Sequence, residues 1–279
     1  MTNIPDQFLP YKGIFGCDNE VFSRGRYEGT LFRFPLRAIP SELSQTLYSD
    51  DKVRSLFHSF INDAHLILLF LRNIESIELY EREKSEPRPR RIFRAEIYDN
   101  SSKRREFYDR VTPGKHMPEP VTVTYPLTIE IEMDSSVQRH SFLVTNYCCG
   151  GKVSSHFEKL LTDEDLSYLP SVGVAMALPP EIDHPTPEIS GHVFCVLPLP
   201  VQKKSMTGLP VHVNGFFALS QNRRHIKTPT ADQENQGKMT DKSLLWNCCL
   251  LEEAVPKAYA SMIREAINSF NVQPEAIYK

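Results

Sequence analysis

Hydrophobic positions recur with a helical period in two long stretches of the chain. The first follows Ser49, Asp50 and Asp51, any of which can cap a helix, and extends to about Asn73. Its apolar residues are spaced by three and four positions, which is the spacing of one buried helix face. They are Val53, Leu56, Phe57, Phe60, Ile61, Ala64 and Leu68. This pattern predicts a long helix.

The second helical stretch begins after Asp241, another capping residue, and lies near the end of the chain. Its predicted buried side is formed by Leu244, Leu245, Cys248, Leu251, Glu252, Val255, Tyr259, Met262 and Ile263. Proline lacks a backbone N–H and clashes with the preceding turn, so we expect Pro256 to kink this helix or to divide it in two. Shorter helices are predicted at residues 41–48 and 154–161.

Much of the remaining sequence favours strands. Predicted strands cover residues 30–37, 74–80, 92–98, 121–125, 127–133 and 139–147. Pro35 limits the first of them to an edge or a strand end. The last three alternate strongly and are expected to form an antiparallel hairpin through Asp134-Ser-Ser, with one face in water. Residues 81–91 and 100–105 are polar and are expected to be turns.

Two later segments differ in their hydrophobic pattern. Residues 172–178 and 192–199 are continuously apolar, as is typical of strands buried on both faces. In the following stretch, Val211 and Val213 alternate with His212 and Asn214, which predicts a half-buried strand.

A basic cluster follows that half-buried strand. After Gly215 and two phenylalanines, the sequence reaches Arg223 and Arg224. Basic side chains directly after a strand and its turn are well placed to meet an anion. A charge run can also be a loop that simply faces water, and both interpretations stay open at this point.

Composition narrows the class of protein. The chain has 279 residues, 41% of them hydrophobic and 24% charged, which suits one large or two ordinary soluble domains. A net charge of −3 argues against a general binder of nucleic acid or membrane surfaces. The longest apolar run, residues 66–71, is far shorter than the roughly 20 residues that span a bilayer. The first residues show no secretion signal, so we expect a cytoplasmic protein.

Motifs for enzyme chemistry are missing from the sequence. The six cysteines form no C-x-x-C pair and match no zinc spacing, which favours reduced, buried thiols. The chain contains no nucleophile elbow, H-E-x-x-H or G-x-G-x-x-G. His192 and Cys195 lie three positions apart on a predicted strand, so they should face opposite sides and form no catalytic dyad.

Several stretches together resemble the internal repeats of the sacsin family, whose members are very large neuronal co-chaperones. They are residues 6–16, 29–37, 66–71, 194–200 and 207–217, with Asn222-Arg-Arg224, Leu245-Trp-Asn247 and Val255-Pro-Lys-Ala-Tyr259. Repeats of this family are similar to the ninety-kilodalton heat-shock chaperones, which are GHKL ATPases. The likeness covers nearly the whole chain.

The resemblance implies an α+β fold, a largely antiparallel mixed sheet with helices on one side, as in the middle or transducer segment of those chaperones. Residues 1–37 would be the tail of a truncated nucleotide-binding-like domain, and residues 38–279 the middle segment. In the chaperones, a loop after a Leu-Pro strand brings an arginine to the γ-phosphate of ATP. Here Leu209-Pro-Val would be that strand, and Arg223 or Arg224 the phosphate contact.

The resemblance also implies a function. The leading expectation is a non-catalytic scaffold, client-contact or transducer segment in protein quality control. The alternative is half of a split GHKL ATPase that supplies a phosphate-sensing arginine. A GHKL nucleotide site needs a D-x-G-x-G turn, which this sequence lacks, so we expect no catalytic residue, metal or cofactor in this chain alone, and ATP with Mg²⁺ only in the full repeat. Expected partners are other repeats of the same protein, the seventy-kilodalton heat-shock chaperone machinery and client proteins, with no nucleic acid and no membrane.

Overall fold

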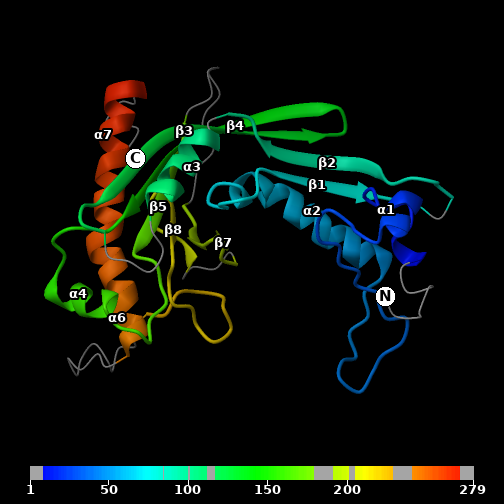
Figure 1. The fold of residues 1–279 in the computed structure, drawn as a ribbon, viewed down its shortest axis with the longest axis horizontal. Coiled ribbons are helices and arrows are strands. Elements are labelled where there is room, and N and C mark those ends of the chain that lie inside the picture. The colour runs from blue at the N-terminus through cyan, green and yellow to red at the C-terminus, as the bar shows by residue number, and fades with distance from the viewer. Residues whose placement is uncertain are drawn as a thin grey trace. The chain divides into compact units, whose positions relative to one another are not determined.

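The computed structural model describes residues 9–83, 85–99, 101–111, 117–178, 191–200, 205–228 and 241–270. The chain divides into two compact units (Figure 1). The first unit comprises residues 1–63 and 78–94, and the second comprises residues 64–77 and 95–279. The boundary falls within α2 (Asp50–Ile67), β1 (Ser76–Glu81) and β2 (Arg90–Ile97). The predicted boundary at residue 37 stays a prediction, and residues 1–8 lie outside the described part.

The first unit holds α1 (Asn19–Arg24) and most of α2, β1 and β2. Asp18 caps α1 by accepting hydrogen bonds from the backbone N–H groups of Glu20 and Val21, and Gly25, with φ of 67°, ends it. The strands β1 and β2 are neighbours in one sheet. The predicted helix at residues 50–73 is confirmed but ends at Ile67, and the predicted strands at residues 74–80 and 92–98 are confirmed with shifted ends.

Residues 30–48 differ from the prediction. The segment 30–37 is not a strand: within the described residues no other strand pairs with it, and Pro35 removes one backbone donor. The short helix at residues 41–48 is also absent, because the backbones of Ser41 and Ser44 bond each other and Arg37 donates to the carbonyl oxygens of Ser44 and Thr46. These bonds replace the helical pattern with a turn.

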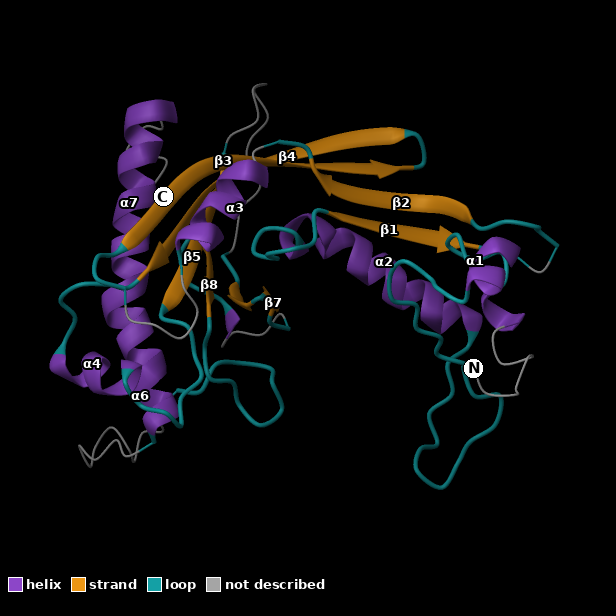
Figure 2. Cartoon of the chain, viewed as in Figure 1, coloured by secondary structure: helices purple, strands orange, loops and turns teal. Residues whose placement is uncertain are grey.

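The second unit is built on a largely antiparallel sheet, which confirms the predicted α+β class (Figure 2). Its strand order is β3-β4-β5-β8-β6-β7. The strands are β3 (Val121–Met133), β4 (Ser136–Cys148), β5 (Ser171–Ala177), β6 (Val193–Cys195), β7 (Leu197–Pro198) and β8 (His212–Gly215). Among the pairings of these six strands, β6 with β8 is parallel and the others are antiparallel. The hairpin of β3 and β4 turns at Asp134 and Ser135, whose φ angles of 48° and 67° suit a two-residue turn.

Helices pack on one face of this sheet. They are α4 (Ser155–Leu161), α6 (Lys242–Cys249), the π-helix η3 (Leu250–Ala254) and α7 (Val255–Phe270). Alternate residues of the strands, such as Leu143 and Val174, form one apolar cluster with Trp246, Leu250 and Met262. Figure 1 shows α7 running along the strands. Burial of this cluster is the main source of stability in the second unit.

The opposite face of the sheet is covered as well, although the family resemblance implied helices on one side only. Residues 68–70, after the end of α2, and α3 (Ser101–Arg110) lie there. Phe70 packs directly on Gly173 of β5, where an added Cβ would come within 2.8 Å of the ring. Because both faces are covered, every residue of β8 is buried. The prediction that His212 and Asn214 occupy a solvated face is therefore wrong.

The helix α3 replaces the turn predicted at residues 100–105. Its sequence is strongly charged, but Arg104 and Phe107 are both buried. The Arg104 guanidinium donates to the carbonyl oxygens of Leu68 (3.3 Å) and Ile74 (3.2 Å), which fixes the turn after α2. Burial lowers the pKa of Arg104. Arg104 thus attaches the helix to the turn after α2, a contact that hydrophobic periodicity does not reveal.

The C-terminal helix begins as predicted at Asp241, whose carboxylate accepts the N–H of Ser243 at 2.8 Å. The helix is divided before Pro256 by η3, a turn of π-helix that is wider than an α-helical turn. A π-turn inserts one extra residue, so the buried face moves to Leu250, Ala254, Ala258, Met262 and Ala266. The predicted position Leu251 is 40% exposed. The predicted stripe is therefore correct only in part: Leu244 and Met262 are buried, whereas Leu251 and Glu252 are exposed, because a constant helical period cannot include the extra residue.

Candidate functional site: the loop after β8

The loop that carries Arg223 and Arg224 follows β8 directly and is drawn in teal in Figure 2. We define it as the arginine loop, residues 216–226. Its two sides form a narrow hairpin, because Leu219 pairs with Ile226 and the N–H of Ser220 donates to the carbonyl oxygen of His225 at 2.9 Å. The loop is thus ordered by its own backbone.

Polar side chains shape the tip of the arginine loop. The Asn222 Oδ1 atom accepts hydrogen bonds from the N–H of Arg224 (3.1 Å) and the hydroxyl of Ser220 (2.7 Å). The N–H of Arg223 donates to the carbonyl oxygen of Ser220 at 2.8 Å. Arg223 has φ of 55°, in the left-handed region, which costs an L-residue roughly 1–2 kcal/mol. The surrounding hydrogen bonds hold Arg223 in this unfavourable conformation.

Two residues of α6 clamp the base of the loop. Trp246 and Asn247 are both buried, and the indole Nε1–H donates to the carbonyl oxygen of Phe216 at 2.9 Å. The Asn247 side chain accepts from the N–H of Ala218 (2.8 Å) and donates to the carbonyl oxygens of Ala218 and Lys227 (both 2.9 Å). One amide therefore joins both sides of the loop and ties them to the helical core.

The tip is positively charged and open to solvent. Arg223 and Arg224 are exposed, and neither forms an ion pair with another described residue. A shallow depression of about 380 Å³ in the same loop is lined by Ser220, Gln221 and Asn222. An arginine guanidinium can bind a phosphate or carboxylate through two parallel hydrogen bonds. The arrangement is suited to contacting an anion on another molecule or domain.

The basic residue at the base of the loop, Lys227, has an acidic partner. Lys227 Nζ lies 3.4 Å from Asp241 Oδ2, at the start of α6. Burial opposes ionisation of Asp241, but the N–H of Ser243 and the Lys227 ammonium outweigh it and hold the pKa of Asp241 below its usual value. This pair links the end of the loop to α6 and leaves the two arginines of the tip uncompensated.

The structure brings together Arg223 and Arg224, as the sequence suggested, at one loop tip. Sequence reasoning missed Trp246 and Asn247 as the residues that position it. Helical periodicity assigned Leu244, Leu245 and Cys248 to the buried side and gave no reason for a buried amide. The stretch Leu245-Trp-Asn247 did belong to the family resemblance, which was the available signal.

Other candidate chemistry is less well supported. Cys195 donates its thiol to the carbonyl oxygen of Phe217 at 3.6 Å. Burial raises the pKa of Cys148 and of Cys149 to about 12, which disfavours their reactive thiolates. Among the described residues, no group of three or more His, Cys, Asp or Glu is arranged to hold a metal ion. In the same part of the chain, no helix combines the length and apolar character needed to cross a bilayer.

Comparison with known proteins identifies the family. The family model described as "Sacsin domain" matches residues 1–94. Human sacsin is 37% identical over an alignment of 305 residues that includes the entire chain. The chain belongs to the sacsin family. It spans only 6% of the length of human sacsin, so it corresponds to a small part of that protein.

This membership applies to both ends of the molecule. The sacsin domain match includes the first unit, with its exposed N-terminal segment. The similarity to human sacsin continues through the arginine loop and the C-terminal helices. The sacsin-like character is therefore a property of the whole chain.

Proposed function

We propose that this chain is a non-catalytic middle, or transducer-like, segment of a chaperone-related repeat, acting as a scaffold, client-contact or transducer surface in protein quality control. The arginine loop carries the proposal. It is firmly anchored by Asn247, yet its tip presents Arg223 and Arg224 without a described carboxylate partner. A loop that is rigid at its base and uncompensated at its tip is suited to meeting a charged group elsewhere.

The first unit supports the same proposal. Phe32 and Phe34 are 74% and 82% exposed, and their rings stack on each other with centroids 6.2 Å apart. Large apolar residues exposed together mark a surface that another domain or protein covers. This observation favours residues 1–37 as the tail of a nucleotide-binding-like domain, with residues 38–279 as the middle segment.

A second candidate function is half of a split GHKL ATPase that supplies a phosphate-sensing arginine to a nucleotide domain. The left-handed backbone of Arg223 favours this arginine over Arg224, because strained residues concentrate at functional sites. In this version ATP and Mg²⁺ bind the full repeat and the chain alone binds neither. Cytoplasmic location, partnership with other repeats and with the seventy-kilodalton chaperone machinery, and absence of nucleic-acid and membrane binding belong to both versions.

Nucleotide binding and turnover test the two versions. The chain alone is expected to show neither hydrolysis above buffer nor a thermal shift with Mg-ATP, and a saturable shift at sub-millimolar ATP would contradict the proposal. The decisive measurement uses a longer protein that includes the upstream domain. If the split-ATPase version holds, Arg223→Ala or Arg224→Ala lowers turnover at least tenfold, since an arginine that stabilises phosphoryl transfer contributes about 10³–10⁵ in rate.

A matched control separates loss of charge from loss of function. Arg264 lies exposed on α7, away from the arginine loop in sequence, and Arg264→Ala removes the same charge. If turnover stays at the wild-type level with both loop arginines replaced, the phosphate-sensing role is wrong and the scaffold version remains. If Arg264→Ala lowers turnover equally, the effect is one of general charge.

A further inference from the structure

Four histidines gather on one side of the sheet in the second unit. We call them the histidine cluster: His65 near the end of α2, His140 on β4, His192 just before β6, and His212 on β8. The rings of His65 and His140 stack with centroids 4.5 Å apart, and those of His192 and His212 meet edge to face at 5.7 Å. The ring of Phe142 connects the two pairs, at 6.4 Å from His65 and 6.2 Å from His212.

His212 is the most constrained member of the cluster. It is only 2% exposed, and its Nδ1 atom accepts a hydrogen bond from the backbone N–H of His192 at 3.2 Å. Accepting at Nδ1 requires the neutral imidazole with its proton on Nε2. A second proton would have to go to Nδ1, where it would face the N–H of His192. Protonation and this hydrogen bond therefore exclude each other.

The hydrogen bond at His212 lies in a short seam between β6 and β8. Only two residue pairs form the parallel ladder, Val193 with Val213 and Phe194 with Asn214. Side chains supply much of the remaining attachment: the N–H of Val196 donates to Asn214 Oδ1 at 2.8 Å, beside the His212 contact. The carbonyl oxygen of His192 also accepts the N–H of Val213 at 2.9 Å, so opening the seam breaks this backbone bond together with the side-chain bonds.

A strained turn lies next to the seam. Val196 has φ of 69°, which is rare for a β-branched residue, and it lies between β6 and β7, where Cys195 pairs with Leu197 and Phe194 with Pro198. The hydrogen bond from the Val196 N–H to Asn214 attaches this turn to β8.

We propose that the histidine cluster is an acid-responsive latch, in which protonation of His212 releases residues 192–196 from β8. The proton enters at Nδ1, the hydrogen bond from His192 is lost, and the released imidazolium becomes hydrated. β8 continues directly into the arginine loop. Release therefore breaks two hydrogen bonds between this part of the chain and the β6 segment, from the Val196 N–H to Asn214 and from the Cys195 thiol to Phe217. The loop remains attached to α6 through Asn247.

Of the titratable groups around His212, His192 and His65 act against its protonation. α2 contributes His65, β4 contributes His140, and the β6 segment contributes His192 and Cys195. β5 carries no titratable residue. None of these groups is a carboxylate. Burial, together with smaller effects of His192 and His65, lowers the pKa of His212 to about 4. Burial also lowers the pKa of His140, so a charge in the closed seam has no counterion among these groups.

The difference in proton affinity between closed and open seams sets the size of the response. A hydrated histidine has a pKa of about 6.5, whereas His212 in the closed seam has one of about 4. Linkage then favours the open seam by about 30-fold more at pH 5 than at neutral pH. Below pH 4 the response levels off, because both states bind the proton.

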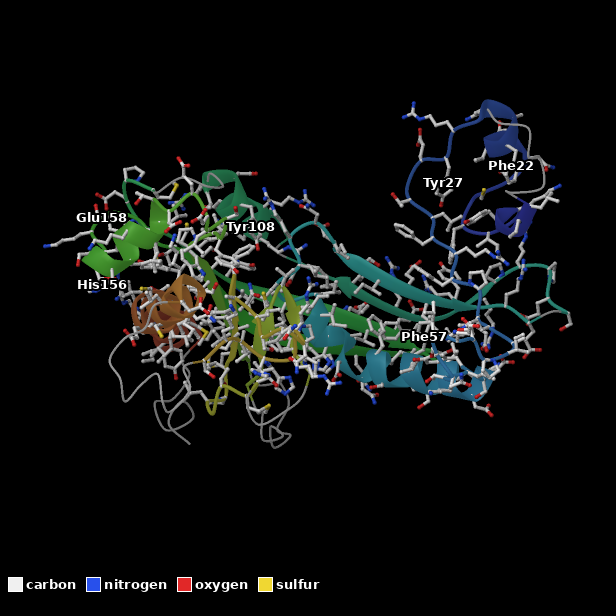
Figure 3. All side chains as sticks on the ribbon, turned by 90° about the horizontal axis from the view of Figure 1, so that it is seen from below. Phe22, Tyr27, Phe57, Tyr108, His156 and Glu158 are labelled. Atoms are coloured by element: carbon white, nitrogen blue, oxygen red, sulfur yellow. The ribbon has the colours of Figure 1, made fainter. Side chains whose placement is uncertain are left out.

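Hydrogen exchange of the full chain, read by mass spectrometry and corrected for intrinsic rates, tests the latch. We expect peptides covering residues 191–200 and 211–215 to lose about 30-fold in protection between pH 7.4 and pH 5, while peptides from α7 keep theirs. In His212→Asn, the side-chain carbonyl can still accept the His192 N–H but does not titrate, so the loss should disappear. The control His156→Asn changes an exposed histidine on α4 and should retain the wild-type response (Figure 3).

Ring titration by NMR gives a readout that does not depend on any variant folding. In the wild-type chain, His212 should titrate well below pH 5.5, and this shift should coincide with loss of the His192 amide signal. An ordinary titration of His212 near pH 6.5 would overturn the proposal. So would an equal loss of protection in His212→Asn and wild type, or unchanged protection at residues 191–200 down to pH 4.5.

Discussion

The two units place their large apolar side chains in opposite ways. In the first unit, Phe32, Phe34 and Leu43 are largely exposed. In the second, Phe157 and Trp246 are almost fully buried, with ring centroids 5.5 Å apart. Strands of the second unit are covered on both faces, whereas the segment 30–48 has no strand or helix of its own to fold against.

Charged contacts reinforce this difference. In the first unit, Glu78 contacts Arg91 at 3.1 Å and Arg94 at 3.4 Å, and all three side chains are about one-third exposed. Partly exposed ion pairs of this kind contribute about 0–1 kcal/mol each. The second unit instead buries an apolar cluster between sheet and helices. The comparison therefore predicts that stability resides in the second unit and that the first is adapted for contact.

The largest expected effect comes from truncating the centre of the buried cluster. Trp246→Ala should lower the free energy of unfolding by about 3–5 kcal/mol, because it removes a fully buried indole that packs on Phe157 and bonds Phe216. Phe34→Ala, the matched change in the first unit, should alter it by no more than about 0.5 kcal/mol. Urea denaturation of both variants checks this. Equal losses would show that the exposed segment is part of the folded core.

A second contrast is between two neighbouring residues of the C-terminal helix, Leu250 and Leu251. Leu250 is fully buried in η3, so Leu250→Ala should cost about 2–5 kcal/mol. Leu251→Ala should cost less than about 1 kcal/mol, because that side chain is partly in water. Thermal or urea unfolding of the pair tests the π-turn directly. A larger loss of stability in Leu251→Ala than in Leu250→Ala would instead support the uninterrupted helical period predicted from the sequence.

Acid should act on the second unit, where His212 lies. In the unfolded chain this histidine binds a proton below about pH 6.5, whereas in the folded chain it does so only below about pH 4. Above pH 6.5 neither state binds the proton, so stability does not depend on it. As the pH falls from 6.5 to 4, the unfolded state binds more protons and stability decreases by about 3 kcal/mol, then levels off.

Denaturation midpoints from pH 7.5 to 4 measure that decrease, and the difference between wild type and His212→Asn isolates it. His156→Asn serves as the control for an exposed histidine. If wild type and His212→Asn show the same slope in this range, the acid sensitivity arises elsewhere.

The smallest expected effect concerns the tip of the arginine loop. Arg223→Gly should raise the free energy of unfolding by up to about 1 kcal/mol, because glycine adopts the left-handed conformation without steric cost. The backbone of Arg224 is not in the left-handed conformation, so Arg224→Gly should be neutral or slightly destabilising. Precise thermal denaturation distinguishes the two. Stabilisation by both changes would point to relief of charge repulsion between the arginines in place of backbone strain.

Local sequence signals succeeded where each signal and its structure lie close together in the chain. The helix after Asp50, the hairpin turning at Asp134 and the cap at Asp241 were all predictable, because capping, alternation and turn formation involve neighbours. The arginine loop was also found from its basic cluster and its family resemblance. Its anchor at Asn247 was not, because the hydrogen bonds from Asn247 to Ala218 span 29 residues.

Errors arose where distant elements decided the outcome. Residues 30–37 have an apolar pattern that suits a strand, but a strand requires a neighbour and this segment has none among the described residues. The charged sequence of α3 gave no sign of a helix, because its key buried residue, Arg104, binds carbonyl groups 30 and 36 positions away.

By itself, the sequence determined the family, the α+β class, the main helix, the hairpin and the position of the two loop arginines. Only the tertiary structure decided which faces are buried. Coverage of both sides of the sheet placed His212 inside a histidine cluster, and the π-turn before Pro256 chose Leu250 over Leu251. The physical reason is that period and capping are properties of neighbouring residues. Burial and proton affinity depend instead on which distant surfaces come together and exclude water.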